Sequence, residues 1–174
     1  NPERAFWQAL FRELSGIAFT AVTQAIFQPY LDMPRRNLLG NHHDLLLIRD
    51  QGGYKIGPHT DSPQKQFSLL FYCPETDDRP DLGTSLYRPK GKTERRIKRT
   101  DSWFRHGIDA EGDFANFDKL YTAPYVPNSL FGFVRTRYSY HAVEPAPGEY
   151  TRQLLIYENF STKASRRLNA TRRP

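Results

Sequence analysis

The stretch QGGYKIGPHTDSPQKQFSLLFY, residues 51–72, joins an irregular glycine-rich segment, a His-x-Asp triplet and a strand-like run. Residues 67–72 are apolar and aromatic, which is typical of a buried β-strand. The glycines and Pro58 favour an irregular backbone that can turn side chains inward. Side chains two residues apart in a strand point to one face, so His59 and Asp61 are expected to aim at one point.

Short strand-like runs recur along most of the chain, separated by turn-forming glycine, proline and asparagine. Ahead of them, residues 2–14 have helical spacing, and a second helix is expected from about Thr20 to Gln28. This pattern predicts a mainly β fold, a sandwich or jelly roll, buttressed by N-terminal helices. The expected strands cover residues 45–49, 67–73, 84–87, 129–135 and 151–157.

The length of 174 residues fits a single domain over residues 1–174. The first residue is Asn1 rather than Met, and we expect that part of the native N-terminus is absent. Cys73 is the one cysteine, which excludes an intrachain disulfide framework and a multi-cysteine zinc site. No apolar run approaches the roughly 18 residues of a membrane span, and no signal-peptide pattern appears. We therefore expect a cytoplasmic protein.

The chain has 25 basic and 19 acidic residues, giving a net charge of +6. Much of the positive charge lies in residues 88–99, RPKGKTERRIKR, and in the C-terminal tail. Such runs are typical of solvated loops, but they also attract anionic substrates such as phosphorylated sugars, acidic glycans or nucleic acid. Residues 90–120 lack strand periodicity and are interpreted either as a lid or as a surface excursion.

A second imidazole, His141, comes much later in the chain, in another strand-like segment. Two imidazoles and one carboxylate on one face of an octahedron form the triad that holds non-haem Fe(II) and leaves positions open. Arg152 follows in the next strand-like run and would supply a fixed cation for a dicarboxylate co-substrate.

The order of motifs resembles the Fe(II)/2-oxoglutarate-dependent oxygenases, and in particular their prolyl-4-hydroxylase-like branch. The resemblance covers residues 45–159, which would form a catalytic β core. It implies a double-stranded β-helix, the cupin-like jelly roll of that family. The motifs that carry it are HTD at 59–61, LGTSLY at 82–87, NSLFGFVR at 128–135, YHAVEP at 140–145 and TRQLLIY at 151–157.

The resemblance implies His59, Asp61 and His141 as catalytic iron ligands. It implies that Arg152 binds the distal carboxylate of 2-oxoglutarate, and that O2 takes the open metal position. The reaction would hydroxylate an unidentified substrate, a small molecule, glycan or peptide, with release of succinate and CO2. The basic run 88–99 tilts this expectation toward an anionic substrate.

Further co-substrate contacts follow from the same resemblance. Tyr72 matches a strand position from which the family donates a hydroxyl to the distal carboxylate, and Ser68 and Leu70 share its face and would line the pocket. Tyr54 departs from the pattern, because relatives often place a tyrosine three residues before the first ligand, where this chain has Ile56. Its role as a cofactor-binding residue is the weakest of this set.

Three alternatives remain beside the oxygenase. The tail RLNATRR, 167–173, looks like the co-substrate signature of nucleic-acid dealkylating oxygenases. It lies in a charged terminal stretch, however, and Arg152 already fills the role of the co-substrate arginine. Nucleic acid is therefore disfavoured as the substrate. The same triad could hold zinc for hydrolysis, which would leave Arg152 unexplained. The chain could also be a non-catalytic metal-binding β-sandwich module. His42, His43 and His106 are assigned to surface or packing roles.

Overall fold

The computed structural model describes residues 2–31, 41–62, 64–91, 114–136 and 138–161. The chain begins with two helices, α1 (Pro2–Leu14) and α2 (Ile17–Phe27), followed by a short 3-10 helix, η1 (Gln28–Tyr30). Gly16 lies between the helices and is the N-terminal cap of α2. Within the described residues no helix combines the length and the apolar character that a membrane crossing needs.

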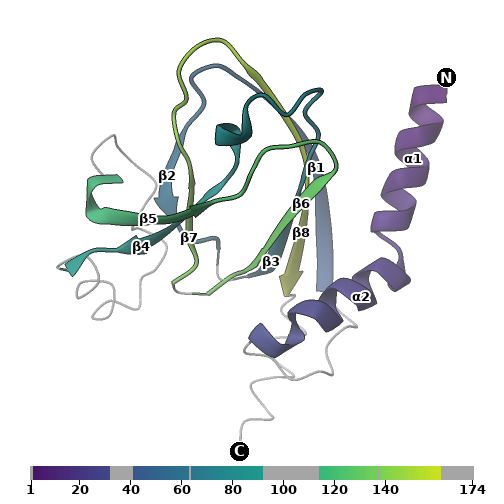
Figure 1. Cartoon of the computed structure of the whole chain (residues 1–174). Helices are drawn as coiled ribbons and strands as arrows, with labels where there is room; N and C mark the ends of the chain where they lie inside the picture. The colour runs from purple at the N-terminus through teal and green to yellow at the C-terminus, as the bar shows by residue number, and fades with distance from the viewer. Residues whose placement is uncertain (1, 32–40, 63, 92–113, 137, 162–174) are drawn as a thin grey trace, which may run out of the picture.

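The strands form two four-stranded antiparallel sheets (Figure 1). The first sheet has the order β1-β8-β3-β6 and the second has the order β2-β7-β4-β5. The strands of the first sheet are β1 (Asn41–Gln51), β8 (Thr151–Ser161), β3 (Lys65–Tyr72) and β6 (Ser129–Val134). Those of the second are β2 (Ile56–His59), β7 (Tyr140–Val143), β4 (Ser85–Pro89) and β5 (Phe117–Thr122), and the 3-10 helices η2 (Pro80–Leu82) and η4 (Phe114–Asn116) precede β4 and β5.

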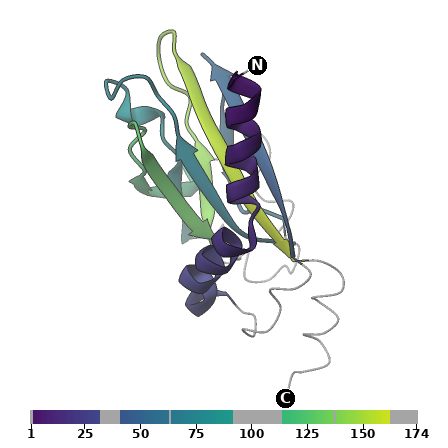
Figure 2. The same cartoon turned by 90° about the vertical axis from the view of Figure 1, so that its right-hand side faces the viewer.

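The two faces of the first sheet have different partners because side chains alternate along each strand. On the outer face, Phe67, Leu69 and Tyr157 pack against Phe19 and Phe27 of α2. Figure 2 shows both helices on this outer side of the sheet. α2 therefore closes one face of the sheet and leaves the other to the second sheet.

The inner face carries the core between the sheets. Leu70 and Tyr72 of β3 lie opposite Ile156 and Leu154 of β8 and share this face with them. This cluster also includes Leu82, Ala123 and Tyr125 from the connections around the second sheet. The inner face is apolar over most of its length, and its charged residues Arg152 and Glu158 lie near the two ends of β8.

The structure confirms a mainly β chain with N-terminal helices. The helix expected at residues 2–14 has those bounds, while α2 begins before the expected Thr20. β1 and β8 run beyond both expected strands, because each pairs with the other over its whole length. β5 corrects the interpretation of residues 90–120 as lacking strand structure: apart from Phe117 its side chains are exposed or half-buried, so the buried-strand pattern is absent from its sequence.

Parts of three sequence expectations lie outside the described residues. These are the lid between residues 92 and 113, the basic run beyond residue 91, and the tail 162–174 that contains RLNATRR. His106 also lies there. Within the described part of the basic run, Arg88 and Lys90 lie 3.8 and 3.6 Å from the carboxylate of Asp118.

Gly83 gives a direct test of the connection between η2 and β4. A Cβ at this position would lie 1.6 Å from the backbone oxygen of Ala123. We expect Gly83→Ala to lower the free energy of unfolding by about 3 kcal/mol or more, because backbone must move. Gly52→Ala is the control, since its Cβ would lie 3.3 Å from the oxygen of Gly148 and should cost less than about 1 kcal/mol. Equal urea midpoints for the two variants would contradict this packing.

Candidate metal centre

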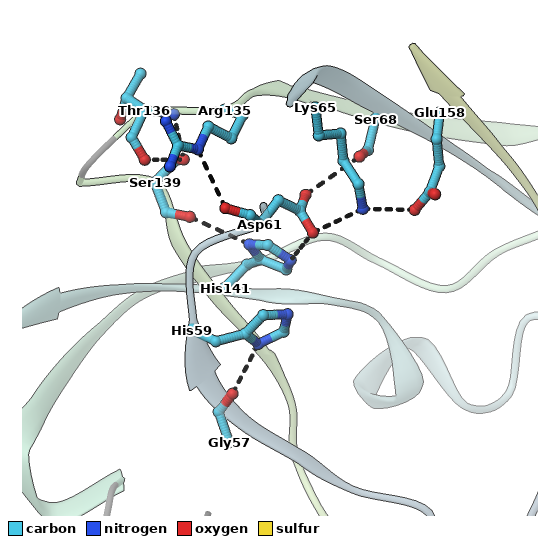
Figure 3. Close-up of polar contacts among 10 residues, drawn as sticks. All are labelled: Gly57, His59, Asp61, Lys65, Ser68, Arg135, Thr136, Ser139, His141 and Glu158. Atoms are coloured by element: carbon cyan, nitrogen blue, oxygen red, sulfur yellow. Dashed lines mark hydrogen bonds and ion pairs between the residues drawn. The ribbon is translucent and has the colours of Figure 1, made fainter. Parts of the chain in front are cut away.

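The pairing of β2 with β7 brings two imidazoles together. His59 and His141 lie directly opposite each other in this antiparallel pair, so their side chains share one face. Their ring centroids are 4.4 Å apart (Figure 3). The ring of Phe133 on β6 lies 4.4 Å from that of His141. The second sheet thus presents both imidazoles toward the first sheet.

Backbone carbonyls orient both rings. The Nδ1 atom of His59 lies 2.9 Å from the oxygen of Gly57, and that of His141 lies 3.1 Å from the oxygen of Ser139. A carbonyl can only accept, so Nδ1 carries the proton in each neutral ring and Nε2 keeps its lone pair. This arrangement is typical of histidine ligands, whose second nitrogen is fixed by a hydrogen bond.

Asp61 joins the two imidazoles by a different route from the one the sequence predicted. β2 ends at His59, so Asp61 lies beyond the strand and strand alternation does not place it. Instead, Arg135 at the end of β6 donates from Nε to the backbone oxygen of Asp61 at 3.1 Å. Its carboxylate oxygen Oδ1 is 3.9 Å from Nε2 of His141. One ligand atom from each of His59, Asp61 and His141 lies within 4.8 Å of the others.

The protonation states suit a metal centre. Burial lowers the pKa of His141 to about 4, so this ring is neutral at pH 7. Burial alone would raise the pKa of Asp61, but His141 and Lys65 outweigh it and the pKa is lowered. Because His141 is neutral at pH 7, Lys65 is the cation that keeps Asp61 ionised there. Burial also opposes the charge on Lys65, yet Asp61 and Glu158 outweigh it and raise its pKa.

The donor set fits a divalent metal ion. Two imidazoles whose Nδ1 atoms are held by carbonyls and the carboxylate of Asp61 each offer one ligand atom, and these atoms lie within 4.8 Å of one another. The set suits Fe(II) in a facial triad and is also compatible with zinc. His141 is buried, and His59 and Asp61 are partly buried.

Arg152 lies at the start of β8 and, by alternation along the strand, on the inner face with Leu154 and Ile156. It is 5% exposed, and its Nε donates to Oδ2 of Asp50 at 3.1 Å while Nη1 donates to the oxygen of Leu82 at 3.2 Å. Asp50 is its register partner on β1. A co-substrate carboxylate at Arg152 would therefore meet a guanidinium that is already oriented by an ion pair. Neither of these two bonds engages Nη2.

The other predicted co-substrate residues fall into different surroundings. Tyr72 is buried on the inner face, and its hydroxyl accepts a hydrogen bond of 2.9 Å from the amide of Thr84. Burial raises the pKa of Tyr72, which keeps this hydroxyl protonated. Leu70 packs in the core beside it. Tyr54 is 42% exposed, with its ring centroid 5.9 Å from the guanidinium carbon of Arg152.

Ser68 lies beside the metal triad. Its hydroxyl donates to Oδ2 of Asp61 at 3.3 Å. Sequence reasoning missed the groups around it, Lys65, Glu158 and Arg135. The i, i+4 spacing of Asp61 and Lys65 was an available signal for one of these contacts, but no local pattern connects Glu158 or Arg135 to the triplet.

Comparisons with known proteins give weak likenesses. No protein-family model matches the chain, and no curated protein matches it. Solved structures with similarity include HygX from Streptomyces hygroscopicus with iron bound, at 12% identity and a TM-score of 0.43, covering 84% of this chain and 68% of that one. The same protein with nickel and 2-oxoglutarate bound has 11% identity, a TM-score of 0.43, and coverage of 84% and 67%.

A structure of Bacillus endospore appendages, a family of disulfide-linked pili, has 8% identity, a TM-score of 0.33, and coverage of 71% and 90%. Likenesses of this size do not place the chain in a family. The site is therefore interpreted from its own geometry.

The buried, neutral His141 predicts a pH dependence of the metal-free protein. Its folded pKa of about 4 lies below the unfolded value of about 6.5. The unfolded state then binds more protons between these values, so stability is lost as the pH falls from about 6.5 to 4, by up to about 3 kcal/mol. Urea unfolding with a chelator present measures this loss. His141→Asn should flatten the dependence, and an unchanged slope in that variant would show that His141 is not its source.

Proposed function

We propose that this chain is an Fe(II)- and 2-oxoglutarate-dependent oxygenase that hydroxylates a substrate with release of succinate and CO2. The observation that carries the proposal is the convergence of His59, Asp61 and His141 with both Nδ1 atoms held by carbonyls. Arg152 adds a buried guanidinium on the inner face of the facing sheet. These groups together suit a metal and a dicarboxylate keto acid.

The sheet orders support the same proposal. Eight antiparallel strands in the orders β1-β8-β3-β6 and β2-β7-β4-β5 are compatible with a double-stranded β-helix, a form of jelly roll. In this arrangement β7 and β8 belong to different sheets and face the same interior. The third ligand on β7 and the guanidinium on β8 can then act on one bound molecule.

The roles of the residues follow from their contacts. His59, Asp61 and His141 would hold the metal, which when bound supplies the site of O2 activation. Arg152 would bind the distal carboxylate of 2-oxoglutarate, and the Tyr72 hydroxyl, protonated and buried, can donate to the same group. Leu70 and Ile156 lie opposite each other on the inner face and would keep water from the co-substrate.

The metal and co-substrate assignment can be tested by spectroscopy without oxygen. Adding Fe(II) and 2-oxoglutarate should produce a weak visible charge-transfer band that Asp61→Ala abolishes, because the variant lacks the carboxylate ligand. His42→Ala is the matched control, since His42 lies on the exposed end of β1 with Asp44 as its neighbour. A band that persists in Asp61→Ala, or that needs no 2-oxoglutarate, would count against the proposed centre.

The role of Arg152 calls for a variant that does not leave a buried carboxylate unpaired. Removing one partner of a buried ion pair costs about 3–5 kcal/mol, so Arg152→Met is combined with Asp50→Asn. We expect the double variant to fold and to bind 2-oxoglutarate at least about tenfold more weakly, because a charge-assisted bond of roughly 1.5–3 kcal/mol is lost. Asp50→Asn alone is the comparison. Calorimetric titration of the metal-loaded protein measures the affinity, and equal affinities in all three proteins would remove Arg152 from the site.

A further inference from the structure

A β-bulge brings Lys65 to the inner face of the first sheet. In the pairing of β3 with β8, Lys65 lies opposite Phe160 and Phe67 lies opposite Asn159, with a register shift between the two pairs. An extra residue in one strand reverses the alternation of side chains beyond it. Regular alternation would point Lys65 outward, in the same direction as Phe67 two residues later. Because of the register shift, Lys65 instead faces inward, as Ser68 does. Bulges often re-aim a side chain beside a functional site.

The re-aimed ammonium bridges two partly buried carboxylates (Figure 3). Its Nζ lies 2.7 Å from Oδ1 of Asp61 and 2.6 Å from Oε1 of Glu158. The three side chains are 10–15% exposed. Ser68 donates to the other oxygen of Asp61. Both carboxylate oxygens of Asp61 are thus held by donors from β3, and Lys65 is itself fixed by a residue of β8.

We propose that Lys65 is a positioning residue that fixes the carboxylate of Asp61 for metal binding, and that Glu158 holds and neutralises Lys65 for this purpose. The inference rests on the proposed metal centre. A lysine side chain has a long flexible stem. The contact with Glu158 fixes the ammonium of Lys65 in place, so that it can hold the carboxylate of Asp61 in one orientation. The arrangement matches the way in which hydrogen-bonded neighbours orient metal ligands.

The charge of Glu158 explains why a cation can stand so close to a metal ligand. An isolated ammonium beside Asp61 would oppose the binding of a divalent cation. The Lys65–Glu158 pair is neutral as a unit, so it can donate a hydrogen bond to Asp61 without adding net positive charge. A pair that only stabilised the fold would not need to end on a carboxylate of the triad.

The test replaces both members of the pair, Lys65→Met with Glu158→Gln. This double variant keeps the net charge and removes both charges of the Lys65–Glu158 pair together, while Asp61 keeps the hydrogen bond from Ser68. Co(II) is the probe, because its visible spectrum reports coordination geometry and its binding needs neither oxygen nor substrate. We expect the Kd for Co(II) to rise about 10–100-fold, with a changed visible spectrum. Lys90→Met with Asp118→Asn, which removes an exposed ion pair, should leave both unchanged.

The outcomes separate this inference from the proposed function. Urea unfolding of the metal-free proteins shows whether the double variant is folded. If it is folded and its Kd and spectrum equal those of the unaltered protein, Lys65 and Glu158 serve the fold alone and the inference is wrong, while the metal centre stands. If the unaltered protein binds no Co(II), or binds it equally well after His59→Ala, the proposed metal centre and this inference are both overturned.

Discussion

The candidate centre depends on the register between β2 and β7, which sets His59 directly opposite His141. A shift of one residue in either strand would turn one imidazole to the other face of the sheet. The register is supported from both sides of β7, because Leu86 of β4 pairs with His141 on its other edge. Once the two rings face the interior, the carbonyls of Gly57 and Ser139 fix their tautomers, and Asp61 needs only to be held near them.

The first sheet carries the charged residues Arg152 and Glu158, whereas the two imidazoles lie on the second sheet. Its outer face is closed by Phe19 and Phe27 of α2, which leaves the inner face free to carry functional side chains. At one end of β8 this face bears Arg152, and near the other it bears Glu158. Leu154 and Ile156 lie between them and separate the Arg152–Asp50 pair from the Glu158–Lys65 pair. The division of the sheet into a face packed on α2 and a face turned toward the second sheet follows from side-chain alternation.

Among the described residues, Arg152 and Lys65 are cations on this face, and each is paired with a carboxylate. Arg152 is matched by Asp50, and Lys65 is matched by Asp61 and Glu158. Such pairs add little to stability compared with apolar residues of the same size, because desolvation offsets much of their attraction. Their value lies in fixing direction: the guanidinium of Arg152 and the carboxylate of Asp61 are each held by a charged partner.

The sequence by itself determined the chemistry of the proposed centre and the class of the fold. His59, Asp61 and His141 could be selected because the His-x-Asp spacing and the order of motifs single them out, and the strand-like runs predicted a mainly β chain because apolar and aromatic residues cluster between turn signals. It also placed Arg152 and Tyr72 on strands that prove to share the inner face. These inferences depend on residue type and local pattern, which a sequence displays directly.

Only the tertiary structure decided how these residues are supported. Asp61 lies beyond its strand and is held by Arg135, which directly follows β6, and Lys65 reaches it because a bulge reverses the alternation of β3. Asp50 and Glu158 come from β1 and β8, distant in sequence from the groups they pair with. Contacts of this kind depend on strand register and bulges between segments far apart in the chain, and no local pattern of residues specifies them.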